Sequence, residues 1–290
     1  MKKFIYFSLS LLICITLSCS KDQKNKVLNV TAIDNNSSKI VNVKLATLSR
    51  QTLSIGCHDA FSKVFDTKDN IFGYQDCNSV YRLIDVETCK EVKKISLPTA
   101  ISMVVPVPQR NQIIGHYWDG SDHVVVVNRK NGNIVSDKTF SSGAFWNPTT
   151  CFYMETGNEY VLLRSDNVLV FVNPSTGNIN RTLSVGFDIS NGVYDKKHNR
   201  LIGASYSNQT GNTYIVAINL NSGNTLSKVV AQGLDFYLAG ERDYDSETNS
   251  YILVNSNNEV LFFDVATGAV TESYQLDFDL TSLSVWRSRK

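Results

Sequence analysis

The chain has 290 residues, a formal net charge of +1 and only 19% charged residues. This balance, with no run of like charges, excludes the broad electrostatic attraction that basic proteins exert on nucleic acid or anionic lipid. Asn and Ser are abundant and blocks of helix-favouring residues are absent, a composition typical of a turn-rich β protein.

The first residues have the pattern of a secretory signal. Lys2 and Lys3 are followed by an apolar run over residues 4–17 and then by the polar stretch 20–26. A basic start, a short apolar run and small residues before a cleavage point characterise such signals. The run is shorter than the ~20 residues of a membrane-spanning helix. A lipoprotein signal, an ordinary cleaved signal and a signal anchor all fit this pattern, and a cysteine at position 19 favours the first.

The stretch Leu17-Ser18-Cys19 resembles the lipobox of bacterial lipoproteins, whose cysteine is acylated and becomes the first residue of the mature protein. Thr16 stands where that family usually has Leu. The resemblance implies a signal peptide at residues 1–18 and a membrane anchor through Cys19. Each acyl CH₂ that enters the bilayer contributes ~0.8 kcal/mol, so several chains on one residue give stable anchoring.

The same resemblance predicts where the mature chain resides. Ser20, rather than Asp, follows the cysteine, which implies the outer membrane. Lys21 and Asp22 are similar to the residues after the cysteine in some surface-exported lipoproteins, so the periplasmic and cell-surface sides both stay open. We expect a lipid-anchored linker at residues 19–26 and one domain over residues 27–290. Removal of the signal, with its two lysines, changes the net charge from +1 to −1.

A repeated strand and turn defines the domain. An apolar strand ends in Asp or Asn, and a four-residue turn that usually closes on Gly follows. The strands of the clear copies are 80–85, 124–128, 168–173, 214–219 and 260–264, and a weaker copy is 27–34. The strand-ending residues Asp85, Asn128, Asn173, Asn219 and Asp264 are separated by 43, 45, 46 and 45 residues. This period matches the ~40–45 residues of a four-stranded propeller blade.

The turn residues have a physical reason. The Asp or Asn side chain can accept hydrogen bonds from the backbone amides that follow it. The Gly supplies the left-handed conformation of a tight hairpin turn. Cys89 and Ser38 stand at the glycine position in two copies, so we expect those two turns to be the least regular.

Two further strands precede each copy, for example 144–154 and 160–163, which gives four strands per unit with the repeated turn between the third and fourth. The first copy lacks a preceding first strand, and residues 280–287 supply such a strand at the other end. We therefore predict an all-β protein, a β-propeller of about six four-stranded blades, closed by N- and C-terminal strands that share one blade. Such closure leaves no free sheet edge.

The turn motif resembles the repeats of YVTN-type, quinoprotein-like and WD40-like propellers, whose strands end in Asp-x-x-Thr-Gly. The closest copy is Asp264 to Gly268. The resemblance covers about residues 27–290 and implies the fold rather than a function. The tryptophan docking pattern of quinoprotein dehydrogenases is missing, and the resemblance implies no cofactor.

Four cysteines remain after Cys19. An even number in an oxidising compartment permits two disulfides with three pairings. Cys57 and Cys77 are expected at one face of the same blade and are the favoured pair. Cys89 and Cys151 are expected at different places and are not expected to pair.

Ligands of propellers usually bind at the face formed by the connections between blades and the loops between second and third strands. There the sequence places aromatic rings beside Asp and Asn side chains, a mixture suited to carbohydrate recognition. The candidate residues of this face are Tyr74, Asp76, His116, Tyr117, Trp118, Asp119, Trp146, Asn147, Arg164 and Tyr206. The phenylalanines that recur at matching positions, Phe187, Phe236 and Phe278, are expected to pack between blades instead.

Trp118 and Trp146 do not recur in other repeats, so a role in ligand contact is weighed against core packing. His116 and His123 flank one loop, but a metal site needs three or four converging ligands, and no metal is expected. No catalytic constellation is visible, and we expect no enzyme activity. The favoured function is a binding module of the cell envelope, as a monomer or in a complex, for a glycan or a protein but not nucleic acid. A scaffold subunit, and a hydrolase or lyase that uses Arg164 with Asp and His in the channel, are the alternatives.

Overall fold

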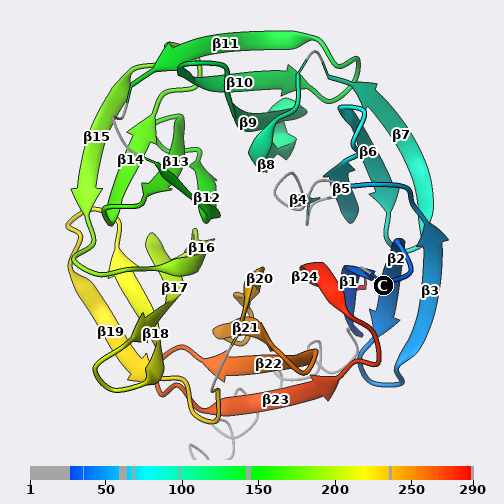
Figure 1. Cartoon of the computed structure of the whole chain (residues 1–290), viewed down its shortest axis with the longest axis vertical. Helices are drawn as coiled ribbons and strands as arrows, with labels where there is room; N and C mark the ends of the chain where they lie inside the picture. Colours follow the sequence, from blue (N-terminus) through cyan, green and yellow to red (C-terminus); the bar gives the residue numbers. More distant parts are fainter. Residues whose placement is uncertain are drawn as a thin grey trace, which may run out of the picture.

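The structure is a computed structural model that describes residues 27–34, 36–58, 64–66, 69–97, 99–141, 145–234 and 237–288. Six four-stranded antiparallel sheets stand around a centre as the blades of a β-propeller (Figure 1). The predicted fold class is therefore confirmed. The predicted signal peptide, Cys19 and the linker lie outside the described residues. Within them, no helix has the length and apolar character needed to span a membrane.

Each blade contains four strands, and the letters A to D give their positions from the centre outwards. Blade 1 contains β24 (Leu280–Arg287), β1 (Leu28–Asp34), β2 (Lys39–Lys44) and β3 (Ser49–Ser54). Blade 2 contains β4 (Val64–Asp66), β5 (Ile71–Gln75), β6 (Val80–Asp85) and β7 (Lys90–Ser96). Blade 3 contains β8 (Ser102–Val107), β9 (Gln112–Trp118), β10 (Asp122–Asn128) and β11 (Ile134–Phe140).

Blade 4 contains β12 (Trp146–Met154), β13 (Glu159–Arg164), β14 (Val168–Val172) and β15 (Ile179–Ser184). Blade 5 contains β16 (Ser190–Asp195), β17 (Arg200–Ser207), β18 (Asn212–Asn219) and β19 (Thr225–Val230). Blade 6 contains β20 (Tyr237–Asp245), β21 (Ser250–Asn255), β22 (Glu259–Asp264) and β23 (Val270–Gln275). A short 3₁₀ helix, η2 (Pro108–Arg110), joins β8 to β9.

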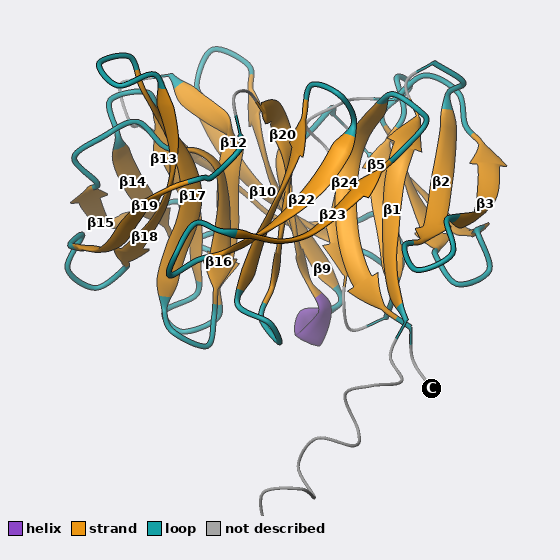
Figure 2. Cartoon of the chain, turned by 90° about the horizontal axis from the view of Figure 1, so that it is seen from below, coloured by secondary structure: helices purple, strands orange, loops and turns teal. Residues whose placement is uncertain are grey.

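The ring has two faces that differ in their loops. The face that we call the B–C face has the loops between strands B and C, and the connections between blades lie against these loops. For example, the amide of Ser165 in such a loop donates to the carbonyl of Phe145 in a connection at 2.8 Å. The opposite face, the A–B face, has the A–B and C–D turns, η2 and the C-terminal end of the described chain (Figure 2).

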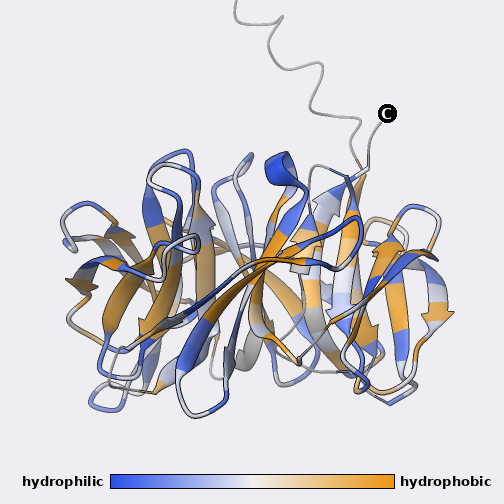
Figure 3. Ribbon diagram, turned by 90° about the horizontal axis from the view of Figure 1, so that it is seen from above, coloured by the Kyte–Doolittle hydropathy of each residue, from blue (hydrophilic) through white to orange (hydrophobic). Residues whose placement is uncertain are grey.

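The core lies between neighbouring blades. The middle strands are buried on both sides because blades stack against both of their surfaces. Strand β13, for instance, is buried at every position but its last, whereas the outer strand β15 has no buried position. Figure 3 shows the same arrangement, with apolar segments in the blade interiors and polar loops at both faces. Complete burial of one large side chain, such as Phe171, contributes ~1.5–3 kcal/mol.

The glycine of the repeated turn has two roles. Its φ is +77° at Gly177 and +76° at Gly223, the left-handed region predicted from the sequence. The turn also packs against the outer strand of the preceding blade. A Cβ on Gly177 would lie 2.7 Å from the carbonyl oxygen of Thr139, and one on Gly223 would lie 2.8 Å from that of Ser184. The glycine of the repeat is therefore required both by the turn and by the contact between neighbouring blades. At Cys89 the chain adopts a similar conformation, φ +52°, without glycine.

The weaker first copy of the repeat was placed wrongly. Strand β1 pairs with β24 on one side and β2 on the other, so it is the second strand of its blade and not the third. The turn that ends at Ser38 is consequently a B–C loop. The C–D turn of blade 1 comprises residues 45–48, and Leu48 takes the left-handed conformation at φ +53°. That turn, Leu45-Ala46-Thr47-Leu48, has no Asp, Asn or Gly to reveal it.

Closure of the ring depends on strand β24, as predicted. Beyond its pairing with β1, this strand is bound by blade 6. The amide of Val285 donates to the carboxylate of Asp243 at 2.5 Å, and Arg287 forms an ion pair with Asp245. The indole of Trp286 donates to the hydroxyl of Thr31 at 2.9 Å within blade 1. The two ends of the chain are thus joined by buried strand pairing and by interactions from both sides.

A single disulfide is present among the described cysteines. Cys57 and Cys77 are bonded, with their Cα atoms 5.5 Å apart, which is the favoured pair from the sequence. The bond links the connection from blade 1 to the B–C loop of blade 2. Cys89 and Cys151 are free thiols, buried and partly buried respectively.

Candidate binding face of blades 3 and 4

The ten candidate residues from the sequence are distributed around the ring. Tyr74 and Asp76 belong to blade 2, and Tyr206 belongs to blade 5. The others lie in blades 3 and 4: His116, Tyr117, Trp118, Asp119, Trp146, Asn147 and Arg164. The structure therefore brings together the group around the β9–β10 loop and the start of β12, and leaves blades 2 and 5 apart from it.

The two blade 2 residues have structural roles. Tyr74 is buried in the core between blades 1 and 2. Asp76 is buried as well, and its carboxylate accepts hydrogen bonds from Arg82 at 2.7 Å and from the amides of Asn78 and Val80. Burial opposes ionisation of Asp76, but these donors outweigh it and lower its pKa. Both side chains are occupied inside the blade.

Asn147 and Arg164 are also engaged with neighbours. The side chain of Asn147 donates to the carbonyl of Ile189 at 2.9 Å and accepts from Thr149, so it connects blade 4 to blade 5. Arg164 pairs with Asp166 across its own loop, with Nε 2.9 Å from Oδ1. This exposed pair leaves the Asp166 carboxylate at the surface, with half of its side chain accessible.

A partly buried acceptor joins blades 3 and 4 at the B–C face. One oxygen of Asp122 accepts hydrogen bonds from Nε2 of His116 at 2.9 Å and from the indole of Trp146 at 2.7 Å. The rings of His116 and Trp146 meet edge to face, and Phe140 packs against both. Burial lowers the pKa of His116, partly offset by Asp122. His116 and Trp146 are therefore fixed in place, and Trp146 is half-buried.

A second cluster fixes the same loop from its outer side. His123 binds Asp137 through Nδ1 at 2.9 Å and Asp119 through Nε2 at 3.1 Å. Tyr117 donates to the other oxygen of Asp137 at 2.6 Å and stacks on His123 with ring centroids 4.3 Å apart. Burial, followed by the contact with Asp137, raises the pKa of Tyr117. The short loop between β9 and β10 is thus restrained on both sides.

Two large rings remain exposed beside these clusters. Trp118 is 70% exposed and Phe145 is 86% exposed. Trp118 lies opposite Asp122 in the β9–β10 pairing, and Phe145 directly precedes Trp146, whose indole bonds to Asp122. One carboxylate therefore connects the segments that carry both rings. Tyr206, on blade 5, is 49% exposed but belongs to neither cluster. Exposed rings of this size on a rigid base require a reason, and contact with a partner is the usual one.

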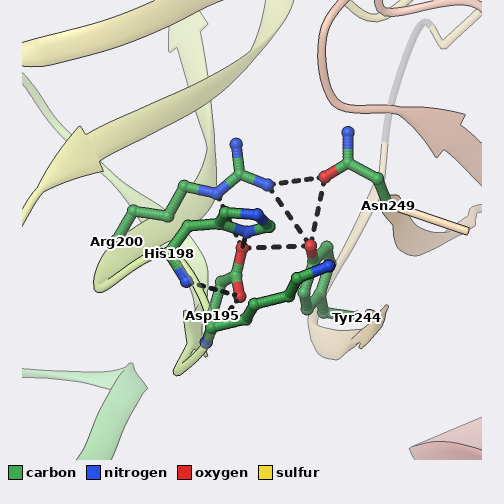
Figure 4. A network of polar contacts seen from close by, with 6 residues as sticks. Asp195, His198, Arg200, Tyr244 and Asn249 are labelled. Carbon is green, nitrogen blue, oxygen red and sulfur yellow. Dashed lines mark hydrogen bonds and ion pairs between the residues drawn. The ribbon is translucent and has the colours of Figure 1, made fainter. Parts of the chain in front are cut away.

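A polar network on the opposite A–B face differs from this site. Asp195 is buried and accepts hydrogen bonds from His198 at 2.6 Å, Arg200 at 2.8 Å and Tyr244 at 3.1 Å (Figure 4). Arg200 also donates to Asn249 of blade 6 at 2.5 Å. Burial opposes ionisation of Asp195, but its three donors outweigh it and lower its pKa.

The network joins blade 5 to blade 6 and forms part of a repeated motif. The A–B turns end at asparagines in the left-handed conformation, namely Asn70, Asn111, Asn158, Asn199 and Asn249. Tyr153 and Tyr194 each donate to the asparagine five residues later, and the hydroxyl of Tyr244, which donates to Asp195, lies 3.1 Å from Oδ1 of Asn249. Although a hollow of about 420 Å³ adjoins Asp195, the polar atoms of this carboxylate are already bonded within the protein. We therefore assign the network to blade packing.

Some residues of the B–C face site were not identified from the sequence. Asp137 and Phe140 lie on the outer strand β11, and their contacts with His123 and His116 depend on the pairing of β10 with β11. A register shift between Val126 and Val127 interrupts that pairing, so counting residues does not reveal the contacts. Within the described part of the chain, no group of three or more His, Cys, Asp or Glu side chains is placed to hold a metal ion.

Comparisons with known proteins show the fold of this chain and do not show its function. No family model matches it, and no curated protein matches it. Among solved structures, it is similar to a protein of unknown function from Bacteroides caccae, with TM-score 0.65, 13% identity, and coverage of 91% of this chain and 100% of the other.

Two further solved structures are similar at lower scores. The dihydro-heme d1 dehydrogenase NirN, in complex with DHE, gives TM-score 0.52 at 8% identity, with coverage of 85% of this chain and 63% of NirN. KlHsv2, with its loop 6CD replaced by a Gly-Ser linker, gives 0.51 at 11% identity, with coverage of 84% and 76%. At these identities the likeness concerns the fold alone. The protein is a six-bladed β-propeller.

Proposed function

We propose that this protein is a binding module without enzymatic activity, retained at the cell envelope by a lipid on Cys19. Its contact surface is the B–C face of blades 3 and 4, and its ligand is a glycan or an envelope protein. A propeller alone carries no function, so the proposal depends on the surface residues. The observation that carries it is the pair of exposed rings, Trp118 and Phe145, on a base that hydrogen bonds hold rigid.

Rigidity matters because binding costs conformational entropy. Exposed side chains on a mobile loop must be ordered when the ligand binds, at ~0.5–1.5 kcal/mol for each immobilised side chain. Here Asp122 and His123 restrain the loop before any ligand arrives. Aromatic residues at the centre of a contact surface are also the residues that most often contribute 2 kcal/mol or more to binding.

We also propose that the anchor lies in the outer membrane. The support is Ser20 after the cysteine and the lipobox-like Leu17-Ser18-Cys19. Metabolic labelling of the full chain in its host with a fatty-acid analogue tests the anchor. Label that disappears in Cys19→Ser supports acylation at this residue, and label that persists in that variant rejects it.

The binding surface is tested with residues 23–290, which contain every contact described above. Trp118→Ala with Phe145→Ala removes both exposed rings and leaves Trp146, which holds the blades together, unchanged. A matched control is Val135→Ala with Leu226→Ala, two side chains that are 54% and 53% exposed on outer strands of blades 3 and 5.

Both double variants are applied to a glycan array and to envelope-protein extracts. Loss of one ring contact of ~2 kcal/mol weakens binding ~30-fold, so loss of both rings should weaken it by at least that factor. We expect that loss in the ring variant and not in the control. A ligand bound equally by the parent and the ring variant would reject this surface as the binding site.

A further inference from the structure

The two faces of the ring differ in charge. Among the described residues, the loops and connections of the B–C face carry only Lys39 and Arg164 as basic residues. Their acidic residues are Asp34, Asp76, Asp119, Asp122, Asp166, Asp188, Glu259, Asp277 and Asp279. Arg82 and Arg50, on strands next to these loops, pair with Asp76 and Asp277, so the acidic residues still outnumber the basic ones. The A–B face has a mixture, with the basic residues Lys44, Lys90, Arg110, Arg129, Lys130, Lys196, Lys197, Arg200 and Arg287 beside a similar number of acidic ones. The overall net charge near zero therefore conceals an acidic B–C face.

The acidic groups extend to the exposed rings. Asp119 directly follows Trp118, and its side chain is 58% exposed. Asp166 lies one residue after Ser165, whose amide binds the carbonyl of Phe145, and its side chain is 50% exposed. The hydrogen bond from Arg164 lowers the pKa of Asp166. Asp119 thus adjoins Trp118 in the sequence, and Asp166 belongs to the loop whose backbone binds the carbonyl of Phe145.

Aromatic rings flanked by carboxylates favour cations. The face of an aromatic ring attracts a Lys or Arg side chain by ~0.5–1 kcal/mol at an exposed site, and Trp is the strongest partner. A neighbouring carboxylate adds an ion pair and attracts the cation from a distance. The chain already uses this chemistry internally, where Lys228 lies 4.7 Å from the ring of Tyr214 and 4.9 Å from that of Phe187.

We infer that the ligand of this surface is a protein segment rich in Lys or Arg, whose cationic side chains lie over Trp118 and Phe145 and pair with Asp119 and Asp166. The inference deepens the proposed function, on which it rests, by choosing the protein ligand over the neutral glycan. Charge complementarity is the reason for the choice. Neutral sugars can donate hydrogen bonds to the surrounding carboxylates but gain no charge attraction from them, and polyanionic glycans are repelled by them.

The probes are fluorescent 12-residue peptides of Gly and Ser with four spaced Arg or Lys residues, and identical peptides with Glu in their place. Binding to residues 23–290 is measured by anisotropy at 50 and 300 mM NaCl. The ring variant is Trp118→Ala with Phe145→Ala, and the charge variant is Asp119→Asn with Asp166→Asn. Its matched control, Asp69→Asn with Glu272→Gln, removes the same charge from the A–B face and from the outer strand β23.

We expect the basic peptides alone to bind. The ring variant should lose ~5- to 30-fold in affinity, from two ring contacts of ~0.5–1 kcal/mol each. The charge variant should lose ~5-fold at 50 mM NaCl and less at 300 mM, because salt screens exposed ion pairs. The charge control should lose less than 2-fold, since long-range attraction alone changes affinity little.

Four results would overturn the inference. Equal binding of basic and Glu peptides would remove the role of charge. Binding of basic peptides that survives the ring variant would be general adhesion to an acidic protein. If a neutral glycan binds the array, is lost in the ring variant and is unaffected by the charge variant, the cationic ligand is rejected while the proposed function stands. Absence of any ring-dependent binding, to peptide, extract or glycan, would reject both.

Discussion

Substitution of Gly177 by Ala tests the claim that the repeated glycine is a contact between blades. The substitution has two costs in the structure. An Ala at φ +77° carries a conformational penalty of ~1–2 kcal/mol. Its Cβ would also lie 2.7 Å from the carbonyl oxygen of Thr139 and 2.8 Å from the Cβ of Lys138, on the outer strand of the neighbouring blade. Backbone cannot move away as a flexible side chain can, so overpacking adds ~1–3 kcal/mol.

Gly211 provides a matched control within the same chain. Its φ is +68°, but a Cβ there would have nothing within 4 Å. Gly211→Ala should therefore show the conformational penalty alone, ~1–2 kcal/mol, whereas Gly177→Ala should lose ~2–5 kcal/mol of unfolding free energy. Urea unfolding of both variants, followed by circular dichroism and tryptophan fluorescence, measures the difference. Equal losses at the two positions would refute the blade contact and leave only the turn.

Three further predictions concern the site, the ring closure and the disulfide. Asp122→Ala leaves the ring donors of His116 and Trp146 unpaired and should lower the unfolding free energy by ~2–4 kcal/mol. Asp122→Asn keeps the accepting oxygen and should lower it by only ~1 kcal/mol. Urea unfolding measures both variants, and equal midpoints would contradict the shared acceptor. Burial raises the pKa of Asp243 from 3.8 to about 6, although the amides of Val285 and Tyr244 bind its carboxylate. The folded protein therefore binds this proton more tightly than the unfolded chain. The stability that the proton contributes is lost as the pH rises from about 4 to 6. Asp243→Asn should remove this term, so that between pH 3.5 and 7 the variant gains ~3 kcal/mol relative to the parent in urea unfolding; a constant difference across that range would show that Asp243 titrates normally. Cys57→Ser with Cys77→Ser opens a loop closed over a sequence separation of 20 and should cost ~3 kcal/mol, and dithiothreitol should lower the thermal midpoint of the parent but not of the variant.

The fold could be predicted because its strongest signals are local. Each clear copy of the repeat has a strand-ending Asp or Asn whose side chain binds the turn amides, as Asp264 does with Thr267 at 2.8 Å. The copy in blade 1 was misplaced because its true turn, residues 45–48, lacks these residues and is closed by backbone hydrogen bonds, from the amides of Thr47 and Leu48 to the carbonyl of Lys44. Backbone groups are common to all residue types, so such a turn has little signature in its sequence.

The site could be predicted only in outline. Sequence position placed Trp118 and Trp146 on one face, but exposure depends on which strands of other blades pack there. Trp146 is half-buried because Asp122 of blade 3 accepts its indole N–H, whereas nothing comparable covers Trp118. Asp76 was predicted to face a ligand, but its carboxylate accepts a hydrogen bond from Arg82 on the adjacent strand. Such contacts between strands are set by register and twist, which residue types alone do not determine.

The meeting of the two chain ends has a geometric consequence. The amide of Ser288 donates to the carbonyl of Val27 at 3.0 Å, and both ends leave from the face opposite Trp118 and Phe145. An attachment at Cys19 would hold Val27, on the face from which both chain ends leave, within ~30 Å of extended chain of the bilayer. The aromatic face, on the opposite side of the ring, would then be the face directed away from the bilayer. For the same reason, a sensor chip that captures the protein through either end would present that face to the solution.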